Sequence, residues 1–440
     1  MAAPLRKRGR TSFLRSKSGH KWSLSAPEQR GRNAQVSYTP APKGDAMYAR
    51  SPVESWAILF SNEILEIILK HTNEQINRRI GELERRQMVI DTSLHKVTDI
   101  VELKAVFGLL YYAGAHKLIK CKTMNWWSVH SMPLFKATMS RNRFTFLFDC
   151  LRFDDKNTRN ERKAIDCFTH IREIWDLFIE RCKNNYEPGK NITIDEQLLS
   201  FRGRCSFKMY ILSKPDKYGF KIVSMNDADT HYMINAIPYC GTVTERVENE
   251  PIPIYYVRKL SEPIYDTNRK VDEESGKPEM ILFYNRTKGG TDSFDQKCHQ
   301  YTVARKTNRW PVRMFYGMLD QAGVNSFVLF NLNQDNRPMK RLEYLMELSL
   351  QLVHPYLVRR LETPTLRGTL RSLIQDFIRP EDVPAEIDIR HDVSDNKMTK
   401  QKRCSLCPSS LDRKTYFKCL QCDKPMCREH VAKISFQCAN

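Results

Sequence analysis

The chain has 440 residues, with 71 Lys and Arg against 51 Asp and Glu, and hence a formal net charge of +20. This length allows roughly two to four domains, and the positive excess predicts a polyanionic partner, for which nucleic acid is the first candidate. The longest apolar run, residues 105–115, is too short to cross a bilayer, and no apolar signal-peptide core opens the chain. We therefore expect neither a membrane protein nor a secreted one. The 13 cysteines should lie in a reducing compartment, where clustered cysteines bind metal.

Residues 1–50 contain eleven Lys and Arg against two acids, with little apolar patterning. Such a composition predicts a disordered basic arm. The run Arg6-Lys7-Arg8-Gly9-Arg10 suits a nuclear localisation signal or a phosphate contact, and a merely solubilising tail is the alternative. The expected localisation is the nucleus.

Helical periodicity dominates residues 51–190. Ser51, Pro52 and Glu54 form an N-cap, first-turn proline and capping-box trio that predicts a helix start. Apolar residues then take helical spacing in four stretches, at about 64–69, 98–112, 144–151 and 168–182. The tryptophans among these stretches fit a core better than a binding platform. The pattern predicts an all-helical domain.

At Asn191 the apolar period changes to that of strands. Residues 192–194 lead into Asp195-Glu196, and residues 220–225 form a central-strand pattern that ends at Asn226-Asp227-Ala228-Asp229, with 231–237 as its hairpin partner. Between these strands, basic residues alternate with aromatic ones. This suits a DNA backbone lying along a strand and loop surface, and a solvated sheet edge is the alternative. The candidate DNA contacts here are Arg202, Arg204, Lys208 and Lys214.

The stretch 281–313 joins carboxylates to a second basic segment. A β-prone run at 281–284 precedes a Gly-Gly turn, and Asp292 and Asp295 should then share one face of a helix that begins near Thr291. Acids that can hold a hard cation, followed by basic and aromatic residues, suit phosphodiester chemistry. An ordinary amphipathic helix is the alternative. The basic candidates in this stretch are Arg305, Lys306, Arg309 and Arg313.

Two long stretches resemble the piggyBac family of cut-and-paste DNA transposases and the domesticated proteins derived from it. They are NRTKGGTDSFDQ followed by RKTNRWP, and ITIDEQLLSFRGRCSFKMYILSKPDKYGFKIVSMNDADTHYMINAIPYCG at residues 192–241. The resemblance implies an RNase H-like α/β core whose carboxylates hold Mg²⁺ or Mn²⁺ for DNA strand cleavage and transfer. By motif it implies catalytic roles for Asp227 and Asp292, with Asp295 as an accessory acid.

The family's middle catalytic Asp has no counterpart in this sequence. The match runs through residues 256–263 and 266–269, and then resumes at 271–278 with the stretch that precedes the Gly-Gly-x-Asp helix. An insertion domain and the strand that carries the second Asp are therefore expected to be missing. Substitutes for the middle acid are available only in a polar loop without a strand pattern to aim them. These acids are Asp266, Asp272, Glu273 and Glu274.

Residues 401–440 hold paired cysteines at two-residue spacing, which predicts structural zinc. By the family pattern, one site would consist of Cys404, Cys407, Cys427 and His430. The other would consist of Cys419, Cys422 and Cys438, with Ser435 in place of a fourth ligand and hence weaker binding. The resemblance implies a finger that reads DNA, and a RING- or PHD-like protein-binding finger is the alternative.

The sequence thus predicts a multidomain α+β protein that binds DNA as a homodimer. Its expected parts are a disordered basic arm (1–50), a helical dimerisation and DNA-binding domain (51–190), a truncated RNase H-like core (191–335), a helical segment and linker (336–400) and a zinc-binding domain (401–440). The expected function is transposase-derived DNA binding with cleavage impaired by loss of the middle Asp. One alternative is an active transposase that cuts at TTAA sites with a substitute carboxylate. Another is a chromatin or protein adaptor that acts through the zinc finger.

Overall fold

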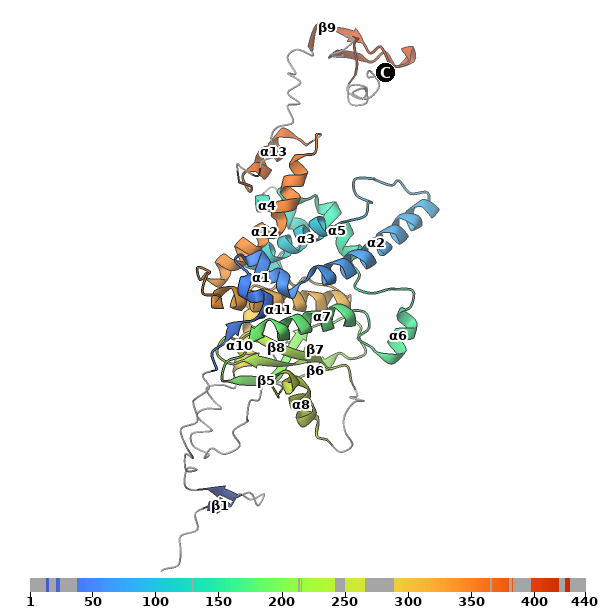
Figure 1. Ribbon diagram of the computed structural model, residues 1–440. Helices are drawn as coiled ribbons and strands as arrows, with labels where there is room; N and C mark the ends of the chain where they lie inside the picture. The colour runs from blue at the N-terminus through green and yellow to red at the C-terminus, as the bar shows by residue number, and fades with distance from the viewer. Residues whose placement is uncertain are drawn as a thin grey trace, which may run out of the picture. The chain divides into compact units, whose positions relative to one another are not determined.

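The structure is a computed structural model that describes residues 13–15, 21–23, 38–128, 130–212, 214, 216–241, 250–265, 289–364, 366–379, 382, 397–418 and 424–427. Two compact units make up the chain, Met1–Ile378 (unit 1) and Arg379–Asn440 (unit 2), and Figure 1 shows their elements. Within the described ranges, no helix has the length and apolar content needed to cross a bilayer.

The helices of unit 1 begin with the expected capping box, in which the Ser51 side chain accepts a hydrogen bond from the Glu54 amide. The first predicted apolar stretch, residues 64–69, lies in the second helix, Asn62–Arg85. The described α-helices are α1 (Pro52–Leu59), α2 (Asn62–Arg85), α3 (Ile100–Ala115), α4 (Pro133–Thr138), α5 (Arg141–Cys150), α6 (Arg159–Ile165), α7 (Arg172–Asn184), α8 (Ile252–Tyr265), α10 (Gly290–Gln300), α11 (Trp310–Leu332), α12 (Arg341–Leu361) and α13 (Gly368–Gln375). Short 3-10 turns lie at Gly44–Tyr48, Leu118–Lys120 and Thr123–Trp127.

The main sheet of unit 1 is antiparallel and centred on β7 (Tyr218–Asp227). Strand β5 (Ile192–Ser200) pairs along the whole of β7, so that Ile192 lies opposite Asp227. The other edge of β7 pairs with β6 (Met209–Tyr210) and β8 (Met233–Pro238). These strands confirm the three strand predictions between residues 192 and 237, whereas the predicted strand at 281–284 lies outside the described residues.

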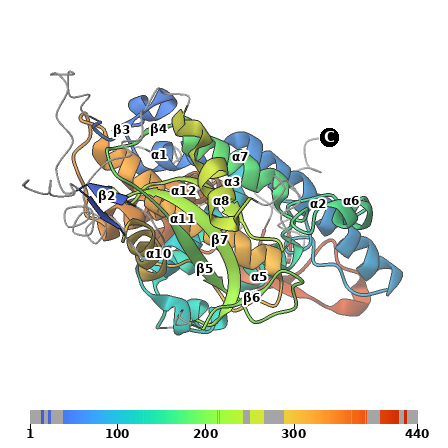
Figure 2. The same cartoon turned by 90° about the horizontal axis from the view of Figure 1, so that it is seen from below.

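Helices cover both faces of this sheet. Helices α7, α10 and α11 contact its strands on one side, and Figure 1 shows α8 on the other side, while Figure 2 shows α10 beside β5. Helix α11 is buried almost all round, as expected for a central helix. It is aligned with the sheet edge by Asn325, whose side chain both accepts from the Met233 amide at 2.9 Å and donates to the Met233 carbonyl at 2.8 Å.

The helical stretch 51–190 packs against elements beyond the predicted boundaries at 190 and 335. The Trp56 indole donates to the Tyr111 hydroxyl at 2.9 Å, and that hydroxyl donates to the Leu319 carbonyl of α11 at 2.7 Å. Helix α3 also packs closely on α12, since a Cβ at Gly108 would lie 2.8 Å from the Ser349 carbonyl oxygen. Because apolar faces of early and late helices bury one another, residues from both ends of unit 1 share one core.

Residues 38–50, at the end of the stretch whose composition predicts a disordered arm, contact the rest of unit 1. Strand β3 (Ala41–Pro42) pairs with β4 (Tyr186–Glu187), and Ala46 is buried. The Asn333 side chain donates to the carbonyl of Met47 at 2.9 Å. Long-range hydrogen bonds of this kind are invisible in a composition that otherwise favours disorder. Earlier in the arm, β1 (Phe13–Arg15) pairs with β2 (Lys21–Ser23).

Unit 2 contains a small hairpin. Strand β9 (Lys397–Arg403) pairs antiparallel with β10 (Lys414–Phe417), and a 3-10 turn at Ser409–Leu411 lies between them. The Ser405 amide donates to the Pro425 carbonyl at 2.8 Å, so the segment 424–427 packs against the hairpin.

Candidate carboxylate site, basic groove and cysteine cluster

The N-terminal turn of α10 packs directly on strand β5. A Cβ at Gly290 would lie 2.8 Å from the Thr193 hydroxyl oxygen, so only glycine permits this approach. Farther along the helix, the buried Gln197 side chain donates to the Asp295 carboxylate at 2.9 Å. Gln197 is itself held by the Gln321 side chain of α11, which donates to it at 2.8 Å. This polar chain fixes α10 and therefore Asp295 relative to the sheet.

Asp195 lies on the face of β5 that α10 covers. Successive side chains of a strand alternate between its faces, so Asp195 shares a face with Thr193 and Gln197. Both of these neighbours contact α10, at Gly290 and at Asp295. Asp195 therefore stands opposite the helix stretch that contains Asp292, and it is half-buried rather than sealed from solvent.

Asp292 is open to solvent at the same place. Its side chain is 67% exposed, and the Lys214 ammonium group lies 3.4 Å from its Oδ1 atom. The same ammonium group donates to the Glu196 carbonyl at 3.2 Å, which ties Asp292 to the residue after Asp195. Asp195 on β5 and Asp292 on α10 are thus both accessible to solvent, and Lys214 links Asp292 to the strand segment that contains Asp195. Carboxylates of this kind are suited to a hard cation.

Asp227, by contrast, is closed. It is fully buried, and both oxygens of its carboxylate accept two hydrogen bonds each. The Gly189 amide and the Tyr186 hydroxyl donate to Oδ2 at 2.7 and 3.0 Å, and the amides of Asp229 and Thr230 donate to Oδ1 at 2.9 Å. Burial, followed by the charge of Asp227, raises the pKa of Tyr186. These hydrogen bonds give Asp227 a role in holding the β7–β8 turn. Asp195, by contrast, is partly open to solvent, although no sequence motif marked it as a site residue.

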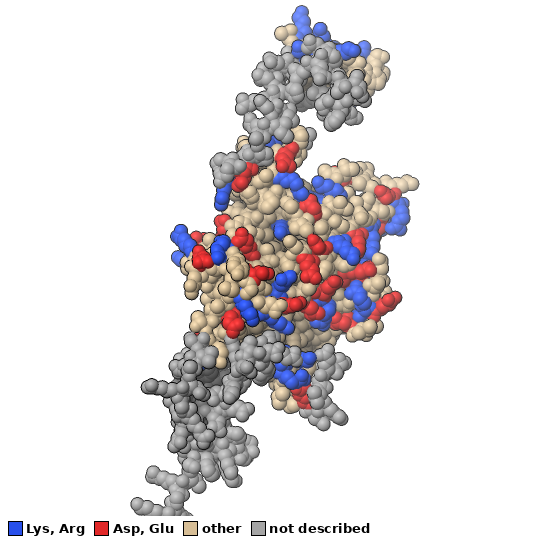
Figure 3. All heavy atoms as spheres, in the orientation of Figure 1, with Lys and Arg blue, Asp and Glu red and all other residues tan. Residues whose placement is uncertain are grey.

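A basic groove lies beyond the carboxylates, between the loop after β5 and the segment after α10. It consists of two adjoining hollows, of about 430 and 390 Å³, which share Arg202, Gly203 and Asn308. The Trp310 ring positions this segment by packing against the buried Phe207, with ring centroids 5.0 Å apart. On the face of unit 1 visible in Figure 3, Lys and Arg are interspersed with Asp and Glu, without a continuous basic patch.

Four basic side chains of the groove are exposed to solvent. They are Arg202, Arg204, Lys217 and Lys306, and within the described residues none of these side chains has a hydrogen bond or an ion pair. Lys208, which is partly buried, donates to the Gly203 carbonyl at 3.0 Å and lies over the Tyr218 ring. The groove can therefore offer positive charge to a polyanion without breaking internal ion pairs.

Two other predicted DNA contacts, Arg309 and Arg313, point inward. Arg309 donates to the carbonyls of Phe148 and Asp149 at 2.9 and 3.3 Å and also to that of Leu151, and burial lowers its pKa to about 10. Arg313 is buried and donates to the Ser200 carbonyl at 2.9 Å. These arginines donate to backbone carbonyls at the ends of α5 and β5. At α5 such carbonyls are available because a helix leaves its last carbonyls unpaired.

Arg305 is intermediate between the two groups. Its guanidinium lies 4.4 Å from the centroid of the Trp126 ring, and burial lowers its pKa to about 10. Its Nε and Nη2 atoms are buried and have no hydrogen-bond partner in the described part of the chain. Since Arg305 also lines the groove, these two N–H groups are suited to an anion that enters it.

A cysteine cluster lies in unit 2. The sulfurs of Cys404, Cys407 and Cys427 all lie within 4.8 Å of one another, and in the described residues this is the sole group of three or more metal-ligating side chains so close together. The sulfurs of Cys407 and Cys427 are 3.7 Å apart. Tetrahedral zinc with Zn–S bonds of about 2.3 Å places its sulfurs about 3.8 Å apart, so these residues fit a metal ion.

Several predicted site residues fall outside the described residues. They are the possible substitutes Asp266, Asp272, Glu273 and Glu274, and the further zinc ligands Cys419, Cys422, His430 and Cys438. The predictions that concern them stay predictions.

Known proteins resemble this chain in sequence. Residues 51–271 and 253–327 match the family described as Transposase IS4. The human PiggyBac transposable element-derived protein 3 is 24% identical over 186 residues, which are 42% of this chain and 28% of that protein. The human Chimeric ERCC6-PGBD3 protein is 24% identical over 186 residues, 42% of this chain and 16% of that protein. The chain thus spans less than a third of the length of these curated relatives.

A solved structure resembles most of the chain. It is the cryo-EM structure of the piggyBac transposase synaptic complex with hairpin DNA, which matches with a TM-score of 0.72 and 32% sequence identity over 89% of this chain and 98% of that one. With the family match over more than half of its length, the chain belongs to the piggyBac-type branch of the transposase IS4 family.

Proposed function

We propose that this protein binds DNA through the basic groove and that its capacity to cleave DNA is impaired. The observation that carries this proposal is the set of exposed cations along the groove, which have no hydrogen bond or ion pair in the described residues: Arg202, Arg204, Lys217 and Lys306. Counterion release from DNA rewards such cations, because each neutralised phosphate contributes to affinity. The related piggyBac transposase, solved with hairpin DNA, supports DNA as the polyanion.

We further propose that Asp195 and Asp292 are the carboxylates of an RNase H-like site for Mg²⁺ or Mn²⁺. This role is supported by the solvent accessibility of both carboxylates and by the packing of α10, which contains Asp292, on the face of β5 that contains Asp195. The Asp227 carboxylate is buried and fully hydrogen-bonded, which argues against its assignment as a ligand. A divalent ion would polarise a phosphodiester oxygen and assist the attack of water or a hydroxyl group. Two carboxylates hold such ions weakly, so we expect little or no strand cleavage without a third acid.

The test is a combined binding and cleavage assay on labelled duplex DNA that carries a transposon end and TTAA, with Mg²⁺ or Mn²⁺. We expect a salt-sensitive mobility shift and no cleavage product. Failure to shift the duplex even at low salt would overturn the DNA-binding proposal. A cleavage product that disappears in both Asp195→Asn and Asp292→Asn would show an active nuclease and overturn the impairment.

Asp227→Asn serves as the matched control in that assay. Because the Asp227 carboxylate accepts hydrogen bonds from buried groups, this variant should lose roughly 1–3 kcal/mol of unfolding free energy. Asp292→Asn, at an exposed position, should stay within about 0.5 kcal/mol of wild type. The reverse order of stabilities would restore Asp227 as the candidate ligand.

For unit 2, we propose a structural zinc ion held by Cys404, Cys407 and Cys427, with His430 as the fourth ligand. The sulfur separation supports this set. Purified protein should contain zinc that Cys404→Ser removes, and a chelator should unfold unit 2 while unit 1 stays folded. Protein without bound zinc, measured by elemental analysis, would contradict the assignment.

Nuclear localisation and homodimerisation belong to the same proposal. The basic run at Arg6–Arg10 supports import into the nucleus, where DNA is available. Deletion of that run should release a tagged protein into the cytoplasm. Light scattering of the full chain tests the dimer.

A further inference from the structure

Beyond the basic groove, the structure holds a second positively charged hollow that involves the helical part of unit 1. We propose that this arginine pocket binds a phosphate group of the DNA backbone, so that a duplex in the groove continues across Asn308 toward the end of α5. The arginine pocket is lined by Arg152, Phe153, Asp154, Arg159, His170, Asn308, Arg309, Trp310 and Pro311. The proposal rests on the DNA binding proposed above and adds Arg152 and Arg159, which the sequence patterns did not indicate as DNA contacts.

The arginine pocket adjoins the groove. Its volume is about 230 Å³, and Asn308 lines it as well as both hollows of the groove. Asn308 is exposed and directly precedes Arg309, whose side chain turns toward the end of α5. A backbone that follows Arg202 and Arg204 to Asn308 therefore meets the arginine pocket next.

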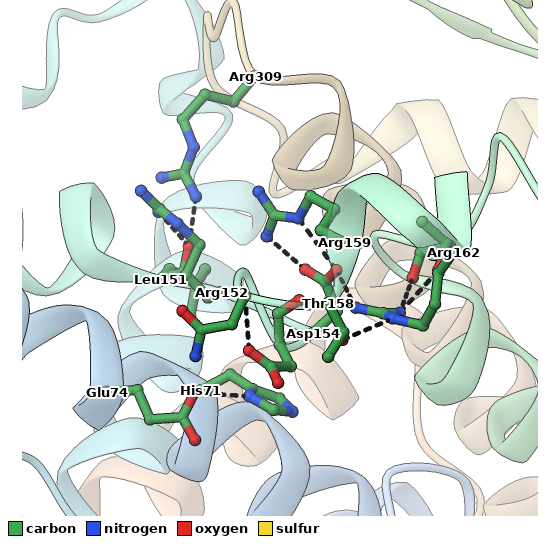
Figure 4. Close-up of polar contacts among 12 residues, drawn as sticks. His71, Glu74, Leu151, Arg152, Asp154, Thr158, Arg159, Arg162 and Arg309 are labelled. Carbon is green, nitrogen blue, oxygen red and sulfur yellow. Dashed lines mark hydrogen bonds and ion pairs between the residues drawn. The ribbon is translucent and has the colours of Figure 1, made fainter. Parts of the chain in front are cut away.

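The pocket carries more positive than negative charge. Its lining contains three arginines, Arg152, Arg159 and Arg309, against a single carboxylate, Asp154. Arg159 donates through Nε and Nη2 to Asp154 at 3.0 and 2.5 Å, and Arg162 from outside the pocket donates to the same carboxylate at 2.9 Å. Figure 4 shows Asp154 between these two arginines. One carboxylate thus serves two arginines, and the positive charge stays in excess.

The remaining arginines of the pocket, Arg152 and Arg309, form no ion pair in the described residues, and their side chains donate to backbone carbonyls, while Asp154 and Asp149 attract them only at longer range. Arg152 donates to the carbonyls of Asp149 and Leu151 at 3.0 and 2.7 Å, and Arg309 binds the neighbouring carbonyls, as Figure 4 shows at Leu151. The end of a helix supplies only about half an elementary negative charge. A phosphate would supply the missing negative charge and accept the planar, paired N–H groups that arginine offers.

The imidazole of His170 also lines the arginine pocket. Burial, and then the charge of Arg159, lowers its pKa to about 4. Its Nδ1 atom is buried and has no hydrogen-bond partner among the described residues. The ring packs edge-on to Trp310 with centroids 5.0 Å apart, so it forms one wall of the pocket and leaves the positive charge to the arginines.

The decisive variant is Arg159→Gln, with Arg162→Gln as its matched control. Both changes remove one arginine from Asp154, but only Arg159 lines the pocket. Binding of a labelled 20-bp duplex should weaken roughly tenfold in Arg159→Gln, with a salt slope shallower by about 1. Arg162→Gln should match wild type, and Arg159→Lys should retain the slope because it keeps the charge. Equal losses in Arg159→Gln and Arg162→Gln would overturn the proposal.

Inorganic phosphate provides a readout that does not depend on DNA binding. At equal ionic strength, phosphate in place of chloride should raise the Tm of wild type and of Arg162→Gln more than that of Arg159→Gln. If wild type binds no duplex, the proposed function fails and this comparison alone decides the site. Loss of the phosphate shift with unchanged duplex affinity would assign the pocket to free phosphate and overturn the backbone contact.

Discussion

Two basic segments border the same groove and use their charges differently. In the loop after β5, Arg202 and Arg204 face solvent without partners in the described structure. In the segment after α10, Arg309 and Arg313 turn inward and donate to backbone carbonyls, and only Lys306 is comparably exposed. In the sequence, the two segments look alike, because both contain basic residues interspersed with aromatic residues.

The difference follows from what lies behind each segment. The loop after β5 crosses the surface of the sheet, whereas the later segment runs over the C-terminal end of α5, where unpaired carbonyls attract cations. A basic residue count therefore overstates the DNA-binding surface. Some of these arginines stabilise the fold and others remain available to a ligand.

The largest effect should come from Arg309→Ala. This change removes three hydrogen bonds that a charged donor makes to carbonyls at the end of α5, and it should cost roughly 3–4 kcal/mol of unfolding free energy, measured by urea denaturation. Lys306→Ala, three positions away and exposed, is the control and should stay within about 0.5 kcal/mol of wild type. Comparable losses would erase the distinction between inward and outward side chains.

Asp320 anchors the start of the inward segment and should make its stability depend on pH. The Thr302 hydroxyl and the Val303 amide donate to it at 2.6 and 2.8 Å, yet burial raises its pKa to about 6. A carboxyl with a raised folded-state pKa contributes stability below its unfolded pKa of about 4, and this contribution is lost as the pH rises through 6. A shift of about two units corresponds to roughly 3 kcal/mol.

The free energy of unfolding of Asp320→Asn should therefore rise relative to that of wild type between pH 4 and pH 7, by up to roughly 3 kcal/mol. Urea denaturation at a series of pH values measures this difference. Asp335→Asn, which replaces an acid that is 66% exposed, is the control and should follow wild type. A constant difference between Asp320→Asn and wild type at all pH values would mean that Asp320 titrates normally.

The triple variant Arg202→Ala, Arg204→Ala, Lys306→Ala tests the outward side chains. Loss of three phosphate contacts should lower duplex affinity roughly hundredfold, about 2.7 kcal/mol, and make the salt slope shallower by about 3. The free energy of unfolding should be unchanged, because these side chains have no partner in the described structure. Unchanged duplex affinity would move the DNA-binding surface away from the groove.

The smallest effect is expected for Lys208→Ala. Its ammonium group already donates to the Gly203 carbonyl, so it offers a phosphate less than Arg204 does. Duplex affinity should fall roughly threefold in a fluorescence anisotropy titration. A loss as large as that of Arg204→Ala alone would show that the internal hydrogen bond gives way on DNA binding.

Local patterns in the sequence predicted much of this structure. The Ser51 capping box, the strands of residues 192–237 and the helix that begins at Gly290 lie where the spacing placed them. These features depend on neighbouring residues, which a sequence displays directly. The pairing of Cys404 with Cys407 also follows a local spacing, whereas their approach to Cys427 was implied by the family resemblance.

Side-chain direction could not be predicted in this way. The partners of Arg309 lie about 160 residues earlier in the chain, and Asp195 is recognised as a candidate ligand only through its neighbours' contacts with α10. Asp227 stood in a convincing motif, but Gly189 and Tyr186 close its carboxylate.

By itself, the sequence determined the family, the secondary-structure elements and the excess of positive charge, because each is encoded in residue order and composition. Only the tertiary structure decided which charges are free to meet DNA, which carboxylates are open, and that early and late helices share one core. The physical reason is that burial and hydrogen bonding between distant residues set the state of each charged group.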